Sequence, residues 1–257
     1  MQKPDIQELS DFLIDYVRAM GSIGTYSSRV NRCAKRIAET FGYTLTLNFS
    51  FAHINVSIVD PQDYSSFRSY LITLKPTHLN FSLVRDLSAL SWAIYDHIHD
   101  LRVAKRCFKK LIRIQKRPFY YYIILQSIAN AALSRLFEGD FGTMIIVLFA
   151  TLLGTSLRVL FTYMRLDERI QCIICSFLSS YLTFWGTKFD CTQTPEVALG
   201  TSILYLIPGV FFINSVIDIL QNYIQIGISR ITNVAIIISC VAIGVYATLT
   251  FSNFRFL

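Results

Sequence analysis

The stretch Ile207-Pro208-Gly209-Val210-Phe211-Phe212-Ile213-Asn214-Ser215-Val216-Ile217-Asp218 decides how the rest of the chain is interpreted. It lies in a long apolar run, yet it contains a Pro-Gly pair, an amide and a carboxylate. Proline removes a backbone N–H and glycine permits non-helical backbone, so Pro208-Gly209 predicts a helix break. Asn214 and Asp218 are four residues apart and would share one helix face. Such groups are costly at membrane depth unless they face protein or water, so the stretch predicts part of a solute pathway.

The composition of the whole chain is typical of a membrane protein. Of its 257 residues 53% are hydrophobic, and the mean hydropathy is +0.45. Residues 1–118 hold 17 of the 24 Lys and Arg but only 10 of the 17 Asp and Glu, and so account for the net charge of +7. Basic segments next to a membrane favour the cytoplasmic side. We therefore expect a cytoplasmic domain at 1–118 and a membrane domain at 119–257.

The pattern of residues 1–118 predicts a small α+β domain. Apolar residues recur at helical spacing over 5–20, 27–41, 82–96 and 101–116, and alternate over the strands 43–49, 52–59 and 67–74. Ser27 or Ser28 is expected to cap the second helix, and Pro76 closes the sheet region. The last helix is strongly basic and leads toward the membrane. Nucleic-acid binding by this helix is not favoured, because a positive-inside bias explains the charge.

Five transmembrane helices are predicted in the rest of the chain, at about 119–137, 141–163, 170–185, 197–221 and 231–251. The fold class is thus an α-helical membrane protein preceded by a small cytoplasmic α+β domain. Arg165, Arg169 and Arg230 lie in the connections on the side of the soluble domain. The opposite connections, Glu138–Asp140 and 187–196, are not basic. This charge map predicts a multi-pass protein with a cytoplasmic N-terminus and a C-terminus outside.

Few side chains in the membrane domain could carry a proton or bind a solute. Asp218 is the only carboxylate placed within a span and is the candidate for proton coupling, or else an interfacial, solvated residue. Arg158 suits the carboxylate of a solute or of Asp218, or else extends to the interface. Asn130 is expected to bond between helices, and small residues are expected to pack helices closely: Ala129, Ala132, Ala150 and Gly154.

Metal, cofactor and enzyme signatures are weak or absent from the sequence. Cys172-x-x-Cys175 lacks a second ligand pair nearby, and His97 and His99 lack a third ligand. Packing is the favoured interpretation of the cysteines, and a solvated loop that of the histidines. Hydrolase triads, phosphate loops and nucleotide fingerprints do not occur. We therefore predict no metal, no cofactor and no enzymatic activity.

Three motifs together resemble a known family. Leu204–Asp218 followed by Gly227-Ile-Ser-Arg230 resembles the signature of the threonine/serine exporter family of bacterial inner-membrane transporters. Phe137-Glu-Gly-Asp-Phe141 resembles its turn between the first two spans. The segment Gly24-Thr-Tyr-Ser-Ser-Arg-Val30, followed by Ala34-Lys-Arg-Ile37, resembles its amino-terminal motif, although an acid commonly stands where Gly24 does. The layout is most similar to the larger subunit of the two-subunit form, which includes a succinate exporter.

The resemblance implies an exporter subunit that works with a second, smaller membrane subunit in a higher oligomer. The solute would be a small carboxylate, either a threonine/serine-type amino acid or a dicarboxylate such as succinate. The broken helix would expose backbone groups, Asn214 would hydrogen-bond the solute, Asp218 would carry a proton, and either arginine would pair with carboxylate. The candidate pathway residues are Pro208, Gly209, Asn214, Asp218, Arg158 and Arg230. The alternative is a membrane-anchored regulatory or scaffolding protein whose cytoplasmic domain binds a partner.

Overall fold

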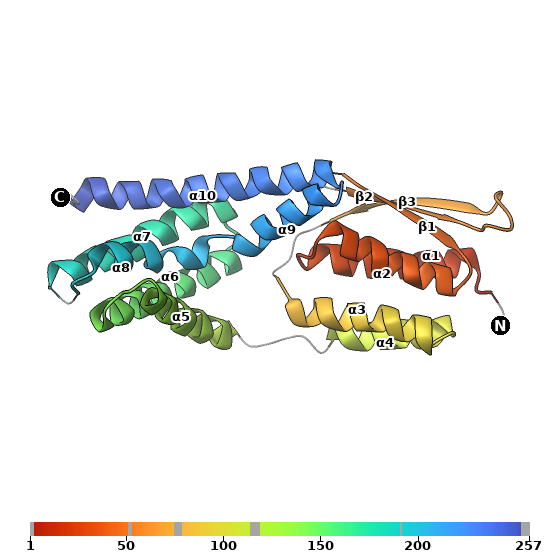
Figure 1. The fold of residues 1–257 in the computed structure, drawn as a ribbon, viewed down its shortest axis with the longest axis horizontal. Helices are drawn as coiled ribbons and strands as arrows, with labels where there is room; N and C mark the ends of the chain where they lie inside the picture. Colours follow the sequence, from red (N-terminus) through yellow and green to blue (C-terminus); the bar gives the residue numbers. More distant parts are fainter. Residues whose placement is uncertain (1–2, 51–52, 75–78, 114–118, 191, 253–257) are drawn as a thin grey trace. The chain divides into compact units, whose positions relative to one another are not determined.

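The computed structural model describes residues 3–50, 53–74, 79–113, 119–190 and 192–252 (Figure 1). The chain forms two compact units: the first contains residues 1–116 and 210–231, and the second 117–209 and 232–257. The domain boundary predicted at 118 and the sheet end predicted at Pro76 both lie outside the described residues. The segment 210–231 thus comes from the predicted membrane domain but packs within the first unit.

Four helices of the first unit have the predicted positions: α1 (Ile6–Ser22), α2 (Ser27–Thr40), α3 (Phe81–Asp96) and α4 (Leu101–Arg113). Each buries the apolar face that its spacing predicts, as α2 does with Val30, Ala34 and Ile37. Gly42 follows α2 with a φ of +77°, a conformation that ends helices and favours glycine. Figure 1 shows α1 and α2 between the sheet and the pair α3 and α4. The phenol of Tyr16, fully buried, donates to Leu87 O and ties α1 to α3.

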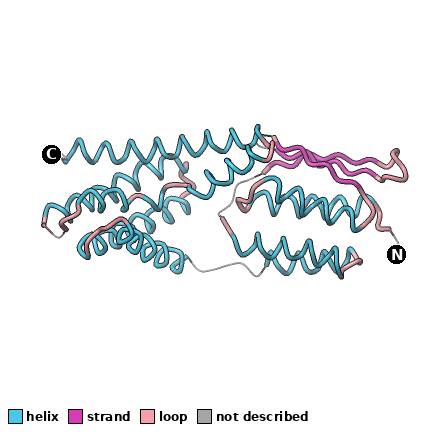
Figure 2. Tube along the Cα trace, in the orientation of Figure 1, coloured by secondary structure: helices cyan, strands magenta, loops and turns pink. Residues whose placement is uncertain are grey.

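The sheet of the first unit contains β1 (Thr44–Phe49), β2 (His53–Val59) and β3 (Phe67–Thr73). The strands are antiparallel in the order β1-β2-β3, and appear in magenta in Figure 2. Alternate residues point into the core, and these are Leu45, Leu47, Ile54, Val56, Ile58 and Ile72. The period-2 pattern in the sequence therefore predicted the three strands correctly.

The second unit is a helical bundle of α5 (Phe119–Leu136), α6 (Phe141–Tyr163), α7 (Glu168–Lys188), α8 (Pro195–Ser202) and the larger part of α10 (Ile224–Ser252). In the described chain, three helices are long and apolar enough to cross a membrane: α6, α7 and α10. A fourth span is possible if α8 and α9 (Gly209–Leu220) together form one broken span. The helix α5 is not among them, so the count of five remains a prediction. The span predicted at 170–185 is longer, because α7 includes its capped first turn.

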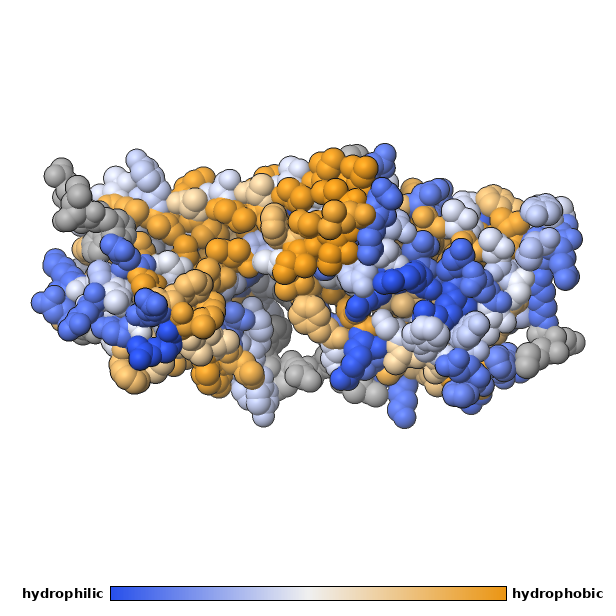
Figure 3. All heavy atoms as spheres, viewed as in Figure 1, coloured by the Kyte–Doolittle hydropathy of each residue, from blue (hydrophilic) through white to orange (hydrophobic). Residues whose placement is uncertain are grey.

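The predicted break in the fourth span is confirmed. The helix α8 ends at Ser202, a single 3-10 turn η1 (Leu204–Leu206) follows, and α9 begins at Gly209. The backbone thus leaves α-helical geometry several residues before Pro208. Figure 3 shows hydrophobic residues gathered over α9 and the start of α10, and hydrophilic residues over α1–α4. The exposed apolar side chains there are Phe212, Ile213, Val216, Leu220, Ile224 and Ile228.

Close packing in the second unit follows the predicted small residues only in α6. Ala150 and Gly154 are buried, and a Cβ on Gly154 would overlap Tyr205 and Ser179. Ala129 and Ala132 are exposed, so their predicted role in α5 is wrong. The inward face of α5 instead carries residues that hydrogen-bond, Ser127, Asn130 and Ser134, together with Ala131. Polar side chains were the better signal in α5, because a helix in a membrane turns its hydrogen-bonding groups toward neighbouring helices and away from lipid.

Candidate functional site

The carboxylate of Asp218 is the centre of a buried polar cluster in the first unit. Asp218 lies on α9 and is 0% exposed, so the interpretation as a solvated interfacial residue is wrong. Its Oδ1 accepts a hydrogen bond of 2.7 Å from the backbone N–H of Ser27. Its Oδ2 pairs with Arg230 Nη1 on α10 at 2.6 Å. A charge removed from water needs this degree of pairing to be tolerated.

Two further bonds connect the same elements to the turn before α2. Arg230 Nη1 also donates to Thr25 O at 3.2 Å, and Asn214 Nδ2 donates to Gly24 O at 2.7 Å. Asn214 is 8% exposed, and shares with Asp218 the helix face that their spacing predicted. Three side chains from α9 and α10 therefore bind the backbone of residues 24–27, which lie about 190 positions earlier in the sequence. We name these residues, Gly24, Thr25, Ser27, Asn214, Asp218 and Arg230, the anchor cluster.

The turn between α9 and α10 explains the Gly-x-x-Arg motif. Asn222 turns the chain with a φ of +65°, so α10 runs back beside α9. A Cβ on Gly227 would lie 3.1 Å from Ser215 O and 2.6 Å from Ile219 Cγ1. Glycine at 227 is therefore what allows the two helices to approach closely. Arg230, three residues later on the same face, then reaches Asp218.

The amino-terminal end of α2 is capped from outside, which corrects the expected capping by Ser27 or Ser28. Neither serine caps α2, and the Asp218 carboxylate takes the Ser27 N–H instead. A carboxylate at this end also interacts favourably with the helix dipole. Gly24 has a φ of +78°, and a Cβ there would meet Leu79 and Phe211. Glycine thus has a steric reason to stand at the position where the resembling family commonly has an acid.

Arg158, the other candidate arginine, lies in the second unit and pairs with Glu168 at 3.1 Å. Of the three alternatives given for Arg158, the structure therefore does not show the pairing with Asp218, whose partner is Arg230. The Arg158 side chain is 24% exposed, and it joins the end of α6 to the start of α7. Pro208 lies between η1 and α9, and Gly209, the first residue of α9, has open space where a Cβ would be added.

Asp140, in the connection between α5 and α6, has a structural role. Its carboxylate caps α6 through Thr143 N and also accepts from Gln193 N and the Thr192 hydroxyl. The N–H groups of Gln193 and Thr143 hold the pKa of Asp140 well below its usual range. Asp140 therefore fixes the connection at 192–194 to the start of α6.

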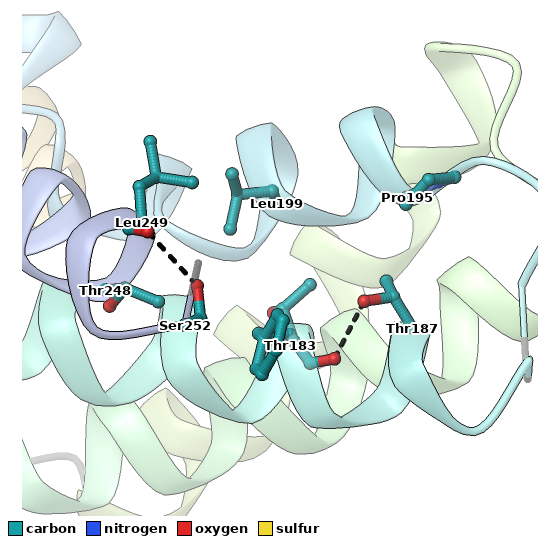
Figure 4. Close-up of a pocket in the computed structure, with 8 residues that line it drawn as sticks. Thr183, Thr187, Pro195, Leu199, Thr248, Leu249 and Ser252 are labelled. Carbon is teal, nitrogen blue, oxygen red and sulfur yellow. Dashed lines mark hydrogen bonds between the residues drawn. The ribbon is translucent and has the colours of Figure 1, made fainter. Parts of the chain in front are cut away.

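The small pocket in Figure 4 lies between α7, α8 and α10 and does not fit a carboxylate. Its hydroxyls already have partners: Thr187 donates to Phe184 O and Ser252 to Leu249 O, while Thr248 bonds across to Ser180 and Phe177 O of α7. None of the described residues that line it carries a charge. Cys172 and Cys175 are buried against Tyr205, Leu206 and Cys240, which confirms packing as their role.

Sequence reasoning missed the contribution of residues 24–27 to the anchor cluster. The signal was present, since the Gly24–Val30 motif was one of the three that resembled the family. Local patterns place Ser27 at a helix start but cannot identify a partner about 190 residues away. The pairing of the two motifs was therefore not derivable from spacing alone.

In the described chain, three helices long and apolar enough to cross a membrane, with the bent pair α8 and α9 as a possible fourth span, are typical of a helical membrane protein. The sequence model of the family described as "Putative threonine/serine exporter" matches residues 11–252. The chain belongs to the threonine/serine exporter family, which confirms the resemblance, and by this membership it is a membrane exporter.

Two relatives carry the name "Probable succinate transporter subunit YjjP". The chain is 21% identical to the one from Escherichia coli (strain K12) over 235 residues, or 90% of each chain. It is also 21% identical to the one from Klebsiella aerogenes over 178 residues, or 69% of each chain. No solved structure matches the chain.

Proposed function

We propose that this chain is the larger subunit of a two-subunit exporter in the bacterial inner membrane. It moves a small carboxylate-bearing solute, a threonine/serine-type amino acid or a dicarboxylate such as succinate, out of the cytoplasm. Family membership and relatives named as succinate transporter subunits support this proposal. Five spans, a cytoplasmic N-terminus and an external C-terminus complete it. A smaller membrane subunit supplies the remaining spans.

The observation that carries the proposal is the buried pair of Asp218 and Arg230 beside a broken helix. Ionisable groups within apolar helices are rare and mark solute or proton pathways. Asp218 is the proton carrier in this proposal, and Asn214 contacts the solute. Arg230 is preferred to Arg158 as the carboxylate-binding residue, because it lies in the same cluster as Asp218.

Proton coupling follows from the exchange of partners at Arg230. While Asp218 is ionised, it satisfies Arg230 and leaves no positive charge for a solute. Protonation of Asp218 removes this competitor, so Arg230 can pair with another carboxylate. The proton state of one side chain thus controls whether the solute can bind.

Solute efflux from membrane vesicles tests the proposal. Vesicles with the chain and a co-expressed smaller membrane subunit are loaded with serine, threonine or succinate, and efflux is followed with and without a pH gradient. We expect efflux of at least one solute only when both subunits are present. The variant Asp218→Asn should remain in the membrane and lose the effect of the pH gradient. Efflux that depends on neither subunit would refute the function, and an unchanged gradient effect in Asp218→Asn would refute the proton role.

A further inference from the structure

We propose that the amino-terminal end of α2 and the guanidinium of Arg230 together form a carboxylate-binding site, filled here by Asp218 and filled by the solute when Asp218 is protonated. The inference rests on the proposed function and deepens it. It adds Ser27 and Ser28, which belong to the extramembrane part of the first unit, to the solute site. The first unit is then part of the transport machinery and not only an appended domain.

Two donors from distant elements converge on one carboxylate in the present state. Ser27 N–H lies 2.7 Å from Asp218 Oδ1, and Arg230 Nη1 lies 2.6 Å from Oδ2. The helix α2 has 14 residues, and its first turn offers free N–H groups and a partial positive charge, a combination that binds anions. An arginine beside it adds a full charge. Asp218 thus occupies a site whose chemistry suits carboxylates in general.

The first two residues of α2, Ser27 and Ser28, also carry hydroxyl groups. Ser27 Oγ and Ser28 Oγ are both buried and have no hydrogen-bond partner among the described residues. Ser27 is 0% exposed as a residue. Buried hydroxyls without partners are uncommon because they lose their bonds to water. They are explained if a ligand other than Asp218 uses them in another state.

A solute carboxylate has an advantage over Asp218 at this site. The Asp218 side chain is fixed to α9, and its two oxygens accept from the Ser27 N–H and from Arg230. A free carboxylate can choose an orientation that also accepts from the two hydroxyls. Carboxylate oxygens have lone pairs enough for all four donors. Whether Asp218 or the solute carboxylate occupies the site therefore depends on whether Asp218 is ionised.

Among the described residues, the charged group that pairs with Asp218 is Arg230. The phenol of Tyr223, in the turn that follows α9, accepts a hydrogen bond from Asn31 on α2. The Tyr26 phenol, next to Ser27, accepts from Arg29 and Arg32. Since Asp218 must be neutral to leave, the solute carboxylate and one proton bind together. Solute binding should therefore strengthen as the pH falls.

Calorimetric titration of the full-length chain in detergent tests the site. The probes are succinate and L-threonine, with succinamide as a control without carboxylates, at pH 7.5 and 5.5. We expect one of the two carboxylates to bind, more tightly at pH 5.5, and succinamide not to bind. Asp218→Asn removes the competitor, so its affinity should be about tenfold higher than that of the unchanged chain at pH 7.5 and independent of pH.

A matched pair of serine variants tests the hydroxyls. Ser28 and Ser82 are each the second residue of a helix, α2 and α3 respectively. Ser28→Ala should weaken binding at pH 5.5 by about fivefold, and Ser82→Ala should not change it. Equal affinities in all variants, with unchanged thermal unfolding, would overturn the inference. If vesicles still export solute in that case, the proposed function survives, whereas absence of any efflux removes the function itself.

Discussion

Removing only one partner of the Asp218–Arg230 pair should destabilise the first unit far more than removing both. In Arg230→Met the Asp218 carboxylate stays buried, keeps the Ser27 N–H and loses its countercharge. An unpaired buried charge of this kind costs about 3–5 kcal/mol of unfolding free energy. The cost has a ceiling, because the chain can fold with Asp218 protonated. Protonating a carboxyl of ordinary pKa near 3.9 at pH 7 costs about 4 kcal/mol.

The double variant Asp218→Asn with Arg230→Met lacks both charges. Its asparagine can still accept from Ser27 N–H, so the cap of α2 remains. The hydrogen bond to Thr25 O is lost with Arg230, at a cost of about 1 kcal/mol. We therefore expect the double variant to lose about 1–2 kcal/mol. The coupling energy between the two positions should then be at least about 2 kcal/mol.

The chain offers a spectroscopic reporter for this cycle. It has two tryptophans, Trp92 on α3 in the first unit and Trp185 on α7 in the second. The guanidinium carbon of Arg36 on α2 lies 3.6 Å from the centre of the Trp92 ring. The fluorescence of Trp92 should therefore respond to loss of the contact between α2 and α3. Denaturation of the purified chain in a Trp185→Phe background would give the four free energies. Additive losses, with no coupling between positions 218 and 230, would refute the role assigned to the pair.

Three further predictions concern the second unit. Gly154→Val should cost about 1–3 kcal/mol by overpacking, whereas Gly200→Ala, which has open space, should stabilise by about 0.5–1 kcal/mol in the same thermal-unfolding assay. Asn130→Leu leaves Thr201 O without its donor at the helix break and should lower both stability, by about 1–3 kcal/mol, and solute efflux. Because folding lowers the pKa of Asp140, its stabilisation should be complete above about pH 4 and disappear as the pH falls further. Asp140→Asn, which can still cap α6, should lack this acid dependence; unchanged acid unfolding would contradict the assignment.

Local patterns predicted most elements of the fold for identifiable reasons. The helices α1–α4 and the three strands have apolar residues at a single clear period, and Gly42 and the Asp60-Pro61 turn separate them. The break near Pro208 was predictable because proline cannot continue a helix. Its start at Ser202 was not, since residues 203–207 are apolar and have no breaking residue. There the amide of Asn130, which bonds to Thr201 O, satisfies a carbonyl at the end of α8.

The candidate site was predicted in its members but not in its connections. Polarity within an apolar run identified Asn214 and Asp218, and both proved to be buried on one helix face. Charge alone could not choose between Arg158 and Arg230, because the choice depends on the turn at Asn222 and the close approach at Gly227. These are features of three-dimensional packing that a single sequence does not encode at any fixed spacing.

The anchor cluster gives one physical reason for two of the three motifs that resembled the family, Leu204–Asp218 with Gly227–Arg230 and Gly24–Val30. Asn214 and Asp218 need a helix face that begins after the Pro-Gly break, and Arg230 needs Gly227 to bring α10 close to α9. Their common target is the turn at Gly24 and the free N–H of Ser27. Any movement of α9 that accompanies transport must therefore either carry the start of α2 with it or break these bonds. Protonation of Asp218 weakens the two strongest of them at once, which makes this carboxylate the natural point of control in the proposed cycle.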